Sequence, residues 1–145
     1  MIYFDTSYLV RLYFEDPGFE RVRELAATDH VCCAPHGQAE TIAAFHRKLR
    51  EQAIPLKAYR GLLVQFEADN QAEAIRWLPS GPDAMTRIRQ VYRDLPPDVY
   101  LRGADALHLA VAAVHGLRIV YSNDDRFLTA AKYFGVKGEN VIPLP

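Results

Sequence analysis

A chain of 145 residues suits one domain with a buried core, expected to span residues 1–145. Half of its residues are hydrophobic and its net charge is −1, which argues against a disordered chain, a coiled coil or a broadly polybasic surface. Cys32 and Cys33 are adjacent in an apolar run, as expected of buried thiols in a reducing compartment. With no signal peptide and no apolar run long enough to span a bilayer, we expect a cytoplasmic protein.

Short strands alternate with helices along the first half of the chain. Strands are predicted at residues 2–4, 31–34 and 75–78. Asp5 can cap a helix after the first strand, and Asp16-Pro17 predicts a second helix with proline at its first position. Further helices are predicted over residues 38–50, from Pro55 through residue 66, and around residues 85–92.

Two features of these helices predict how they pack. In the helix over residues 38–50, the inward side chains are predicted to be Ile42, Phe45 and Leu49, and the outward ones Arg47, Lys48 and Arg50. The helices after Pro17 and Pro55 hold more apolar surface than one small core easily absorbs. We therefore expect a homodimer held by these two helices.

The segment from residue 102 to residue 127 has the most pronounced pattern. A helix that is apolar on nearly every side begins near Asp105 and ends at Gly116, and a buried strand is predicted at residues 119–121. Ser122-Asn123-Asp124 then supplies turn and cap chemistry for another helix. Residues 141–142 are expected to form an edge strand. The alternation predicts an α/β fold with a mostly parallel central sheet flanked by helices on both faces.

Acidic residues follow the ends of predicted strands or begin helices at Asp5, Glu40, Asp105 and Asp124. Because the carboxyl ends of parallel strands meet at one edge, we expect these carboxylates to converge. Close carboxylates repel one another, and a hard divalent cation such as Mg²⁺ or Mn²⁺ relieves that repulsion. No thiolate or imidazole cluster is recognised that would suit a softer metal. The pattern favours metal-assisted phosphodiester hydrolysis.

Three segments, IYFDTS at residues 2–7, DALHLA at 105–110 and SNDDRF at 122–127, resemble, together with Glu40, the acidic motifs of PIN-domain ribonucleases. The length and the early first strand resemble VapC toxins of toxin–antitoxin pairs. The resemblance covers essentially the whole chain. It implies a single PIN-like domain, an endoribonuclease that depends on Mg²⁺ or Mn²⁺, a homodimer, and inhibition by a cognate VapB-type antitoxin.

The resemblance also implies roles for individual residues. By this resemblance the catalytic acids are Asp5, Glu40, Asp105 and Asp124, of which Asp5, Asp105 and Asp124 are the expected metal ligands. The expected supporting residues are Thr6, Ser7, Ser122 and Asp125, and the candidate RNA contacts are Arg47, Lys48 and Arg102. The chain departs from the family pattern before Glu40, where Pro35-His36-Gly37-Gln38 stands in place of the usual serine or threonine.

Each of these residues also has a purely structural interpretation. Asp5 and Asp124 can be helix caps, and Glu40 a partner of a helix dipole in the first turn. Asp105 can pair with Arg102, three residues earlier. His108 is interpreted as a partly buried, hydrogen-bonded histidine rather than a general base, and neither His36 nor His46 belongs to a recognised pattern.

Two other functions stay open. A phosphatase with an aspartate nucleophile also places an acid after the first strand, but it usually has a second acid two residues later, where this chain has Ser7. A non-catalytic RNA-binding or assembly module could use the same scaffold. An activity assay with Mg²⁺ and with EDTA separates these alternatives, and the sequence does not identify the RNA.

Overall fold

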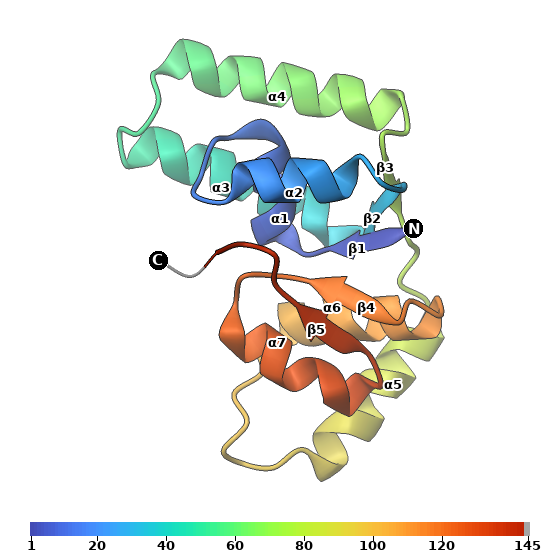
Figure 1. Cartoon of the computed structure of the whole chain (residues 1–145). Coiled ribbons are helices and arrows are strands. Elements are labelled where there is room, and N and C mark those ends of the chain that lie inside the picture. Colours follow the sequence, from blue (N-terminus) through green and yellow to red (C-terminus); the bar gives the residue numbers. More distant parts are fainter. Residues whose placement is uncertain (144–145) are drawn as a thin grey trace.

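The computed structural model describes residues 1–143 and is built on a five-stranded sheet (Figure 1). The strands are β1 (Ile2–Phe4), β2 (Val31–Cys33), β3 (Ile75–Trp77), β4 (Ile119–Tyr121) and β5 (Lys137–Glu139). Their order across the sheet is β3-β2-β1-β4-β5, and every pairing is parallel. The predicted parallel α/β architecture is confirmed.

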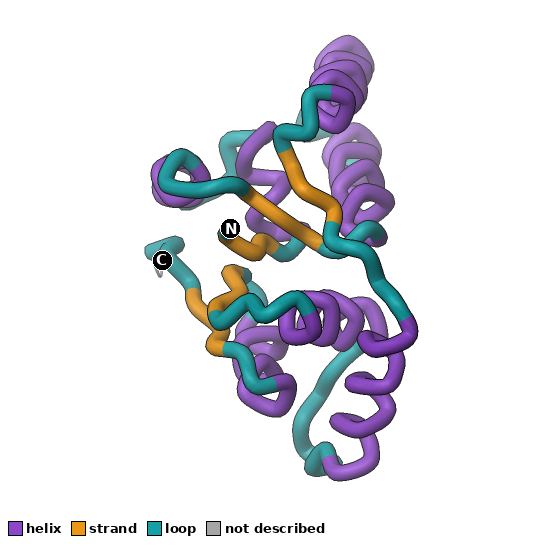
Figure 2. Tube along the Cα trace, turned by 90° about the vertical axis from the view of Figure 1, so that its right-hand side faces the viewer, coloured by secondary structure: helices purple, strands orange, loops and turns teal. Residues whose placement is uncertain are grey.

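Helices cover both faces of this sheet, as Figure 2 shows. One face is covered by α1 (Thr6–Tyr13), α2 (Phe19–Ala26), α3 (His36–Arg50) and α4 (Leu56–Gln71). The other face is covered by α5 (Pro82–Asp94), α6 (Gly103–Val114), α7 (Asp125–Ala131) and the short 3₁₀ helix η1 (Lys132–Phe134). No helix among residues 1–143 is both long and apolar enough to cross a bilayer.

The two halves of the core follow from the alternation of side chains along the strands. Tyr3 and Cys32 point into the core beneath α5, α6 and α7, whereas Phe4 and Cys33 point into the core beneath α1 to α4. Successive residues of a strand face opposite sides of a sheet, so a strand buried on both faces is apolar throughout. All three residues of β2 are buried, as this rule requires.

The predicted start of the second helix is wrong. The helix begins at Phe19, because Gly18 has a φ of 84° and places a left-handed residue immediately after Pro17. The amide of Phe19 donates to the carbonyl of Asp16, so Asp16 to Phe19 form a turn before the helix. Glycine adopts this conformation without strain, whereas most other residues do not.

The predicted edge strand at residues 141–142 is also wrong. The edge strand is β5, whose residues Lys137–Glu139 include no large apolar side chain to mark them in the sequence. Val141 and Ile142 instead pack against the core beneath α1 to α4, and the amide of Val141 donates to the Tyr8 hydroxyl at 2.8 Å. Their apolar character therefore reflects burial after the strand has ended.

Helix α3 begins at His36 rather than near residue 38, and the face that it buries also differs from the prediction. Its buried residues are Gly37, Thr41, Phe45 and Lys48. Ile42, predicted to face inward, is 42% exposed. Lys48, predicted to face solvent, is buried and its Nζ lies 2.7 Å from a carboxylate oxygen of Asp16. A long side chain can follow an apolar surface and still place its charge beside a partner.

Candidate active site

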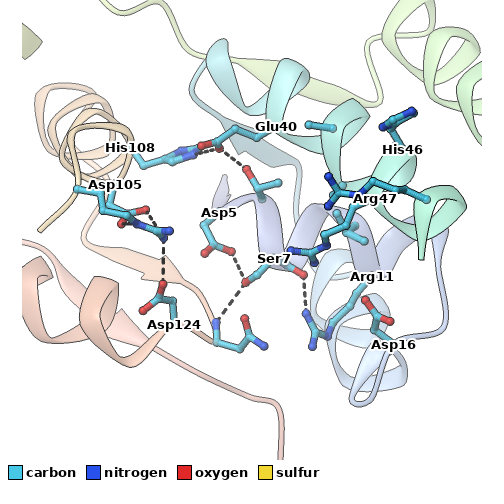
Figure 3. Close-up of a pocket in the computed structure, with 17 residues that line it drawn as sticks. Asp5, Ser7, Arg11, Asp16, Glu40, His46, Arg47, Asp105, His108 and Asp124 are labelled. Atoms are coloured by element: carbon cyan, nitrogen blue, oxygen red, sulfur yellow. Dashed lines mark hydrogen bonds and ion pairs between the residues drawn. The ribbon is translucent and has the colours of Figure 1, made fainter. Parts of the chain in front are cut away.

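A cleft of about 720 Å³ opens at the carboxyl edge of the sheet (Figure 3). Its lining includes the four acidic residues that the sequence pattern singled out, Asp5, Glu40, Asp105 and Asp124. They come from the end of β1, from α3, from the first turn of α6 and from the N-cap of α7. The parallel strand order brings these elements to one edge of the sheet, so the acids share one cleft.

Asp5 forms the buried floor of this cleft. Its Oδ1 accepts hydrogen bonds from the Ser7 hydroxyl at 2.6 Å and the Tyr8 amide at 3.1 Å, and its Oδ2 accepts one from the Ser122 hydroxyl at 2.5 Å. Burial raises the pKa of Asp5, and these three donors offset only part of that rise. Asp5 is therefore both the cap of α1 and a carboxylate held at the cleft.

Ser122 joins Asp5 to the start of α7. Its Oγ donates to Asp5 and accepts a hydrogen bond from the amide of Asp124 at 2.9 Å. Asp124 uses Oδ1 to accept from the amides of Arg126 and Phe127, which caps α7, and its Oδ2 is turned toward Arg102. Capping thus occupies one carboxylate oxygen, and the other is paired with Arg102 in the cleft.

Arg102 lies between two of the acids. Its Nε donates to Asp105 Oδ2 at 2.8 Å, and its Nη2 donates to Asp124 Oδ2 at 3.2 Å. The structural interpretation of Asp105 as a partner of Arg102 therefore describes an observed ion pair. Arg102, predicted as an RNA contact, forms ion pairs with both acids, and its own side chain is 58% exposed.

Glu40 belongs to a separate hydrogen-bonded chain on the other side of the cleft. Its Oε2 accepts from the Thr6 hydroxyl at 2.5 Å and lies 2.7 Å from Nε2 of His108, whose Nδ1 lies 2.8 Å from the Tyr3 hydroxyl. Burial alone would raise the pKa of Glu40, but the contacts with His108 and Thr6 outweigh it and lower this pKa to about 2. Glu40 lies in the second turn of α3, not the first.

His108 is only 2% exposed and is hydrogen-bonded through both ring nitrogens, in keeping with the interpretation drawn from the sequence. Its ring lies 4.0 Å, centroid to centroid, from the ring of His36, which sequence reasoning missed. Ligand atoms of His36, Glu40 and His108 all lie within 4.8 Å of one another, and within residues 1–143 they are the one group of three or more such residues this close. The expectation that no imidazole cluster exists is wrong.

Gly37 lets α3 approach this group closely. A Cβ built at Gly37 would lie 2.5 Å from the Cys33 sulfur and 3.5 Å from Cε1 of His108. Because real Cβ atoms do not come that near a sulfur, a larger residue would displace the helix or the strand. The signal for His36 was its spacing of four residues from Glu40, which places the two on one helix face once the helix begins at His36.

The remaining predicted residues lie in different places. Thr6, Ser7 and Arg47 line the cleft, together with Arg11 and Arg50, which adds a basic side to it. Lys48 does not line the cleft but pairs with Asp16, which does, and Asp125 is exposed outside the cleft. The cleft thus combines a cluster of carboxylates with a basic flank, an arrangement that can bind a cation and a phosphate chain side by side.

Comparisons with solved structures find the same fold. The toxin VapC20 of Mycobacterium tuberculosis, described as cleaving the sarcin–ricin loop, has a TM-score of 0.70 and 21% identity, with 94% of this chain and 99% of that chain covered. FitAcB of Neisseria gonorrhoeae has a TM-score of 0.73 and 21% identity, covering 95% and 96%. VapBC2 of Rickettsia felis, bound to a promoter DNA fragment, has a TM-score of 0.66 and 16% identity, covering 97% and 98%.

Family membership rests on the sequence itself. No curated protein matches the chain. The model of the PIN domain family matches residues 2–133, which is most of the chain. The chain belongs to the PIN domain family.

Proposed function

We propose that this protein is an endoribonuclease dependent on Mg²⁺ or Mn²⁺ and the toxin of a VapBC-type toxin–antitoxin pair. The observation that carries the proposal is the meeting of Asp5, Glu40, Asp105 and Asp124 in one cleft at the carboxyl edge of a PIN domain. The similar structures add support, since VapC20 is described as a toxin that cleaves the sarcin–ricin loop. VapBC2 and FitAB are both described as bound to DNA fragments, which supports a VapB-type antitoxin as partner.

The residue types at the acidic side suit a hard divalent cation, although the oxygens of Asp5, Asp105 and Asp124 do not all lie within 4.8 Å of one another in the structure. Asp5, Asp105 and Asp124 offer carboxylate oxygens, the ligands that Mg²⁺ and Mn²⁺ prefer. The guanidinium of Arg102 bridges Asp105 and Asp124, so this point of the cleft already stabilises positive charge. When bound, such a cation would supply Lewis-acid stabilisation and an activated water for cleavage of an RNA phosphodiester.

The chain's own residues prepare the site for that reaction. Ser7 and Ser122 hold the Asp5 carboxylate from opposite oxygens, which fixes its orientation before any ligand arrives. Glu40, with its pKa near 2, is ionised at neutral pH and is held in place by Thr6 and His108. Arg47 and Arg50 lie on the same cleft and can bind the phosphates of an RNA backbone.

Purified protein should cleave structured RNA with Mg²⁺ or Mn²⁺ and lose that activity in excess EDTA. Asp124→Asn should remove the activity, whereas Asp125→Asn, at an exposed neighbour outside the cleft, should retain it. Products should carry 5′-phosphates, because attack by water rather than by the 2′-hydroxyl leaves no 2′,3′-cyclic phosphate. Cleavage that persists in EDTA would overturn the proposal, and no cleavage of any RNA would favour the non-catalytic alternative.

We also propose a homodimer, with the expected interface narrowed by the structure. Val22 of α2 is fully buried in the protein's own core, so it cannot contribute to an interface. On α4, however, Leu56 is 49% and Val64 71% exposed. Exposed apolar side chains on one helix favour association. Val64→Ser should lower the fraction of dimer in sedimentation at micromolar concentrations, and a wild-type protein that is already monomeric there would contradict the proposal.

A further inference from the structure

We propose that His36, Glu40 and His108 form a second metal site, suited to a borderline transition-metal ion such as Zn²⁺ or Co²⁺. The site lies beside the acidic group but differs from it in chemistry, because two of its ligands are imidazole nitrogens. Imidazole together with carboxylate is a ligand set that favours Zn²⁺ and its neighbours over Mg²⁺. The inference does not depend on nuclease activity.

The fold brings the three ligands together from two helices. His36 and Glu40 are four residues apart on α3, so they lie on one face of that helix, one turn apart. His108 faces Glu40 from α6 across the carboxyl edge of the sheet (Figure 3), and its ring lies 4.0 Å from that of His36. One ligand atom from each lies within 4.8 Å of the other two. Bonds of about 2.0 to 2.2 Å hold the ligand atoms of one ion no more than about 4.4 Å apart, so binding would draw the three side chains slightly closer together.

His36 presents a nitrogen with no other use. Its Nε2 lies 3.1 Å from the carbonyl oxygen of Ala104, which can only accept a hydrogen bond, so Nε2 carries the proton. In the neutral ring, Nδ1 then holds a lone pair. This Nδ1 is buried and has no hydrogen-bond partner within residues 1–143, where it stands as the one such side-chain atom. A buried polar atom without a partner calls for an explanation, and an ion supplies one.

Each ligand has a second residue that holds it in place. The Ala104 carbonyl orients His36, the Tyr3 hydroxyl orients His108, and the Thr6 hydroxyl orients Glu40. The Tyr3 hydroxyl is itself fixed by the amide of Ala34, which donates to it at 3.1 Å. Residues that bind metal in proteins are typically supported in this way, because the outer partner sets the tautomer and the ring orientation.

Binding requires a small rearrangement that the surroundings permit. Glu40 Oε2 and His108 Nε2 are 2.7 Å apart, a hydrogen-bond distance, whereas ligands around a tetrahedral ion lie about 3.3 Å apart. The His108 proton would move from Nε2 to Nδ1, where the Tyr3 oxygen can accept it. Glu40 and His108 both line the cleft, so an ion can reach them and keep a fourth, open position toward the cleft.

The test is a titration of the metal-free protein with Co²⁺, followed by its visible absorption. We expect one equivalent of Co²⁺ to give the intense d–d bands of a tetrahedral site, and Zn²⁺ to abolish them. His36→Gln should weaken Co²⁺ binding at least tenfold. The matched control is His46→Gln, a histidine of the same helix that lines the cleft but lies outside the cluster, and it should leave the bands unchanged. A second control, Asp124→Asn, removes an acid of the other site and should also keep them.

Three results would overturn the inference. The first is the absence of tetrahedral bands in the wild type, and the second is equal Co²⁺ affinity in the wild type and His36→Gln. The third is the loss of the bands in Asp124→Asn with their retention in His36→Gln. If His36→Gln does not fold, Glu40→Gln takes its place, and unchanged binding in that variant would contradict the assignment equally.

Discussion

The two sides of the cleft hold their carboxylates in different ways. On one side, Asp105 and Asp124 are bridged by Arg102, a long side chain that is 58% exposed and free to leave toward solvent. On the other, Glu40 is held by Thr6 and by the almost fully buried ring of His108. An exposed ion pair contributes little stability and can exchange its partner, whereas a buried, charge-assisted hydrogen bond is strong and specific. The first side should therefore exchange its partners more readily than the second.

The largest expected effect comes from substituting Asp5, which lies at the floor of the cleft between the two sides. Asp5→Asn should reduce the proposed metal-dependent cleavage by about 100-fold or more, because it replaces a buried carboxylate oxygen of a proposed metal ligand. Without metal, the same change should increase the free energy of unfolding at neutral pH, because an ionised Asp5 is costly where burial raises its pKa.

The direction in which stability changes with pH follows from the raised pKa of Asp5. The protonated native form is favoured, so the wild type is most stable below the unfolded pKa of about 4 and loses stability as pH rises through the native value. Asp5→Asn should lack this loss. Urea unfolding of both proteins with EDTA, at acidic and neutral pH, measures it, with the exposed Asp125→Asn as control. Equal pH dependence in the wild type and Asp5→Asn would contradict the account.

The second prediction concerns the side of the cleft where Glu40 is held by Thr6 and His108. Glu40→Gln should lower the free energy of unfolding at neutral pH by about 1 to 3 kcal/mol, because the charged partner of a buried histidine is lost. In the wild type the pKa of Glu40 is lowered to about 2, so its stabilisation is present above about pH 4.5 and is lost as pH falls toward 2. Chemical denaturation at pH 7 and pH 3 should therefore show a smaller difference between the two proteins at pH 3.

Glu51→Gln is the control for that change, since Glu51 pairs with Arg47 on the exposed face of the same helix. It should alter stability by less than about 0.5 kcal/mol. A loss in Glu51→Gln as large as that in Glu40→Gln would indicate a general effect of charge on α3 rather than the contact with His108.

The smallest expected effect concerns the side of the cleft where Arg102 bridges Asp105 and Asp124. Arg102→Met should change metal-free stability by no more than about 1 kcal/mol, because the ion pairs of Arg102 are largely exposed. It should strengthen Mg²⁺ binding severalfold in calorimetry, since the arginine and the ion compete for Asp105 and Asp124. Arg126→Met, at a residue whose guanidinium stacks on Tyr100, should leave Mg²⁺ affinity unchanged. Weaker Mg²⁺ binding in Arg102→Met would mean that Arg102 orders the acids rather than competing.

The acidic side could be anticipated from sequence and the imidazole side could not. Asp5 and Asp124 follow short apolar strands, and the strand-end rule for parallel sheets places them together without further information. His36 and His108 are 72 positions apart and meet only because Gly37 allows α3 to lie close to β2. No local sequence pattern predicts that close approach. Because the predicted helix begins two residues too late, it also does not place His36 on the same helix face as Glu40.

The edge strand illustrates the same limit. Lys137–Glu139 forms a strand because β4 offers it a partner, not because its side chains favour burial. Val141 and Ile142 have the apolar character expected of a strand, but they are buried by contact with α1 and its neighbours. Local propensity predicts that a segment will be buried more reliably than it predicts which contacts will bury it.

Because Gly37 has no side chain, substitutions at this one position could change the shape of the cleft. Gly37→Ala changes no charged, hydrogen-bonding or metal-binding group, yet its Cβ would lie 2.5 Å from the Cys33 sulfur, so the first turn of α3 or the Cys33 side chain would have to shift. Because His36 and Glu40 are carried on that turn and the next, a shift of the helix would move both relative to His108. Enlarging this one residue in graded steps, to alanine and then serine, would tune the width of one wall of the cleft while the acids on the opposite wall keep their positions.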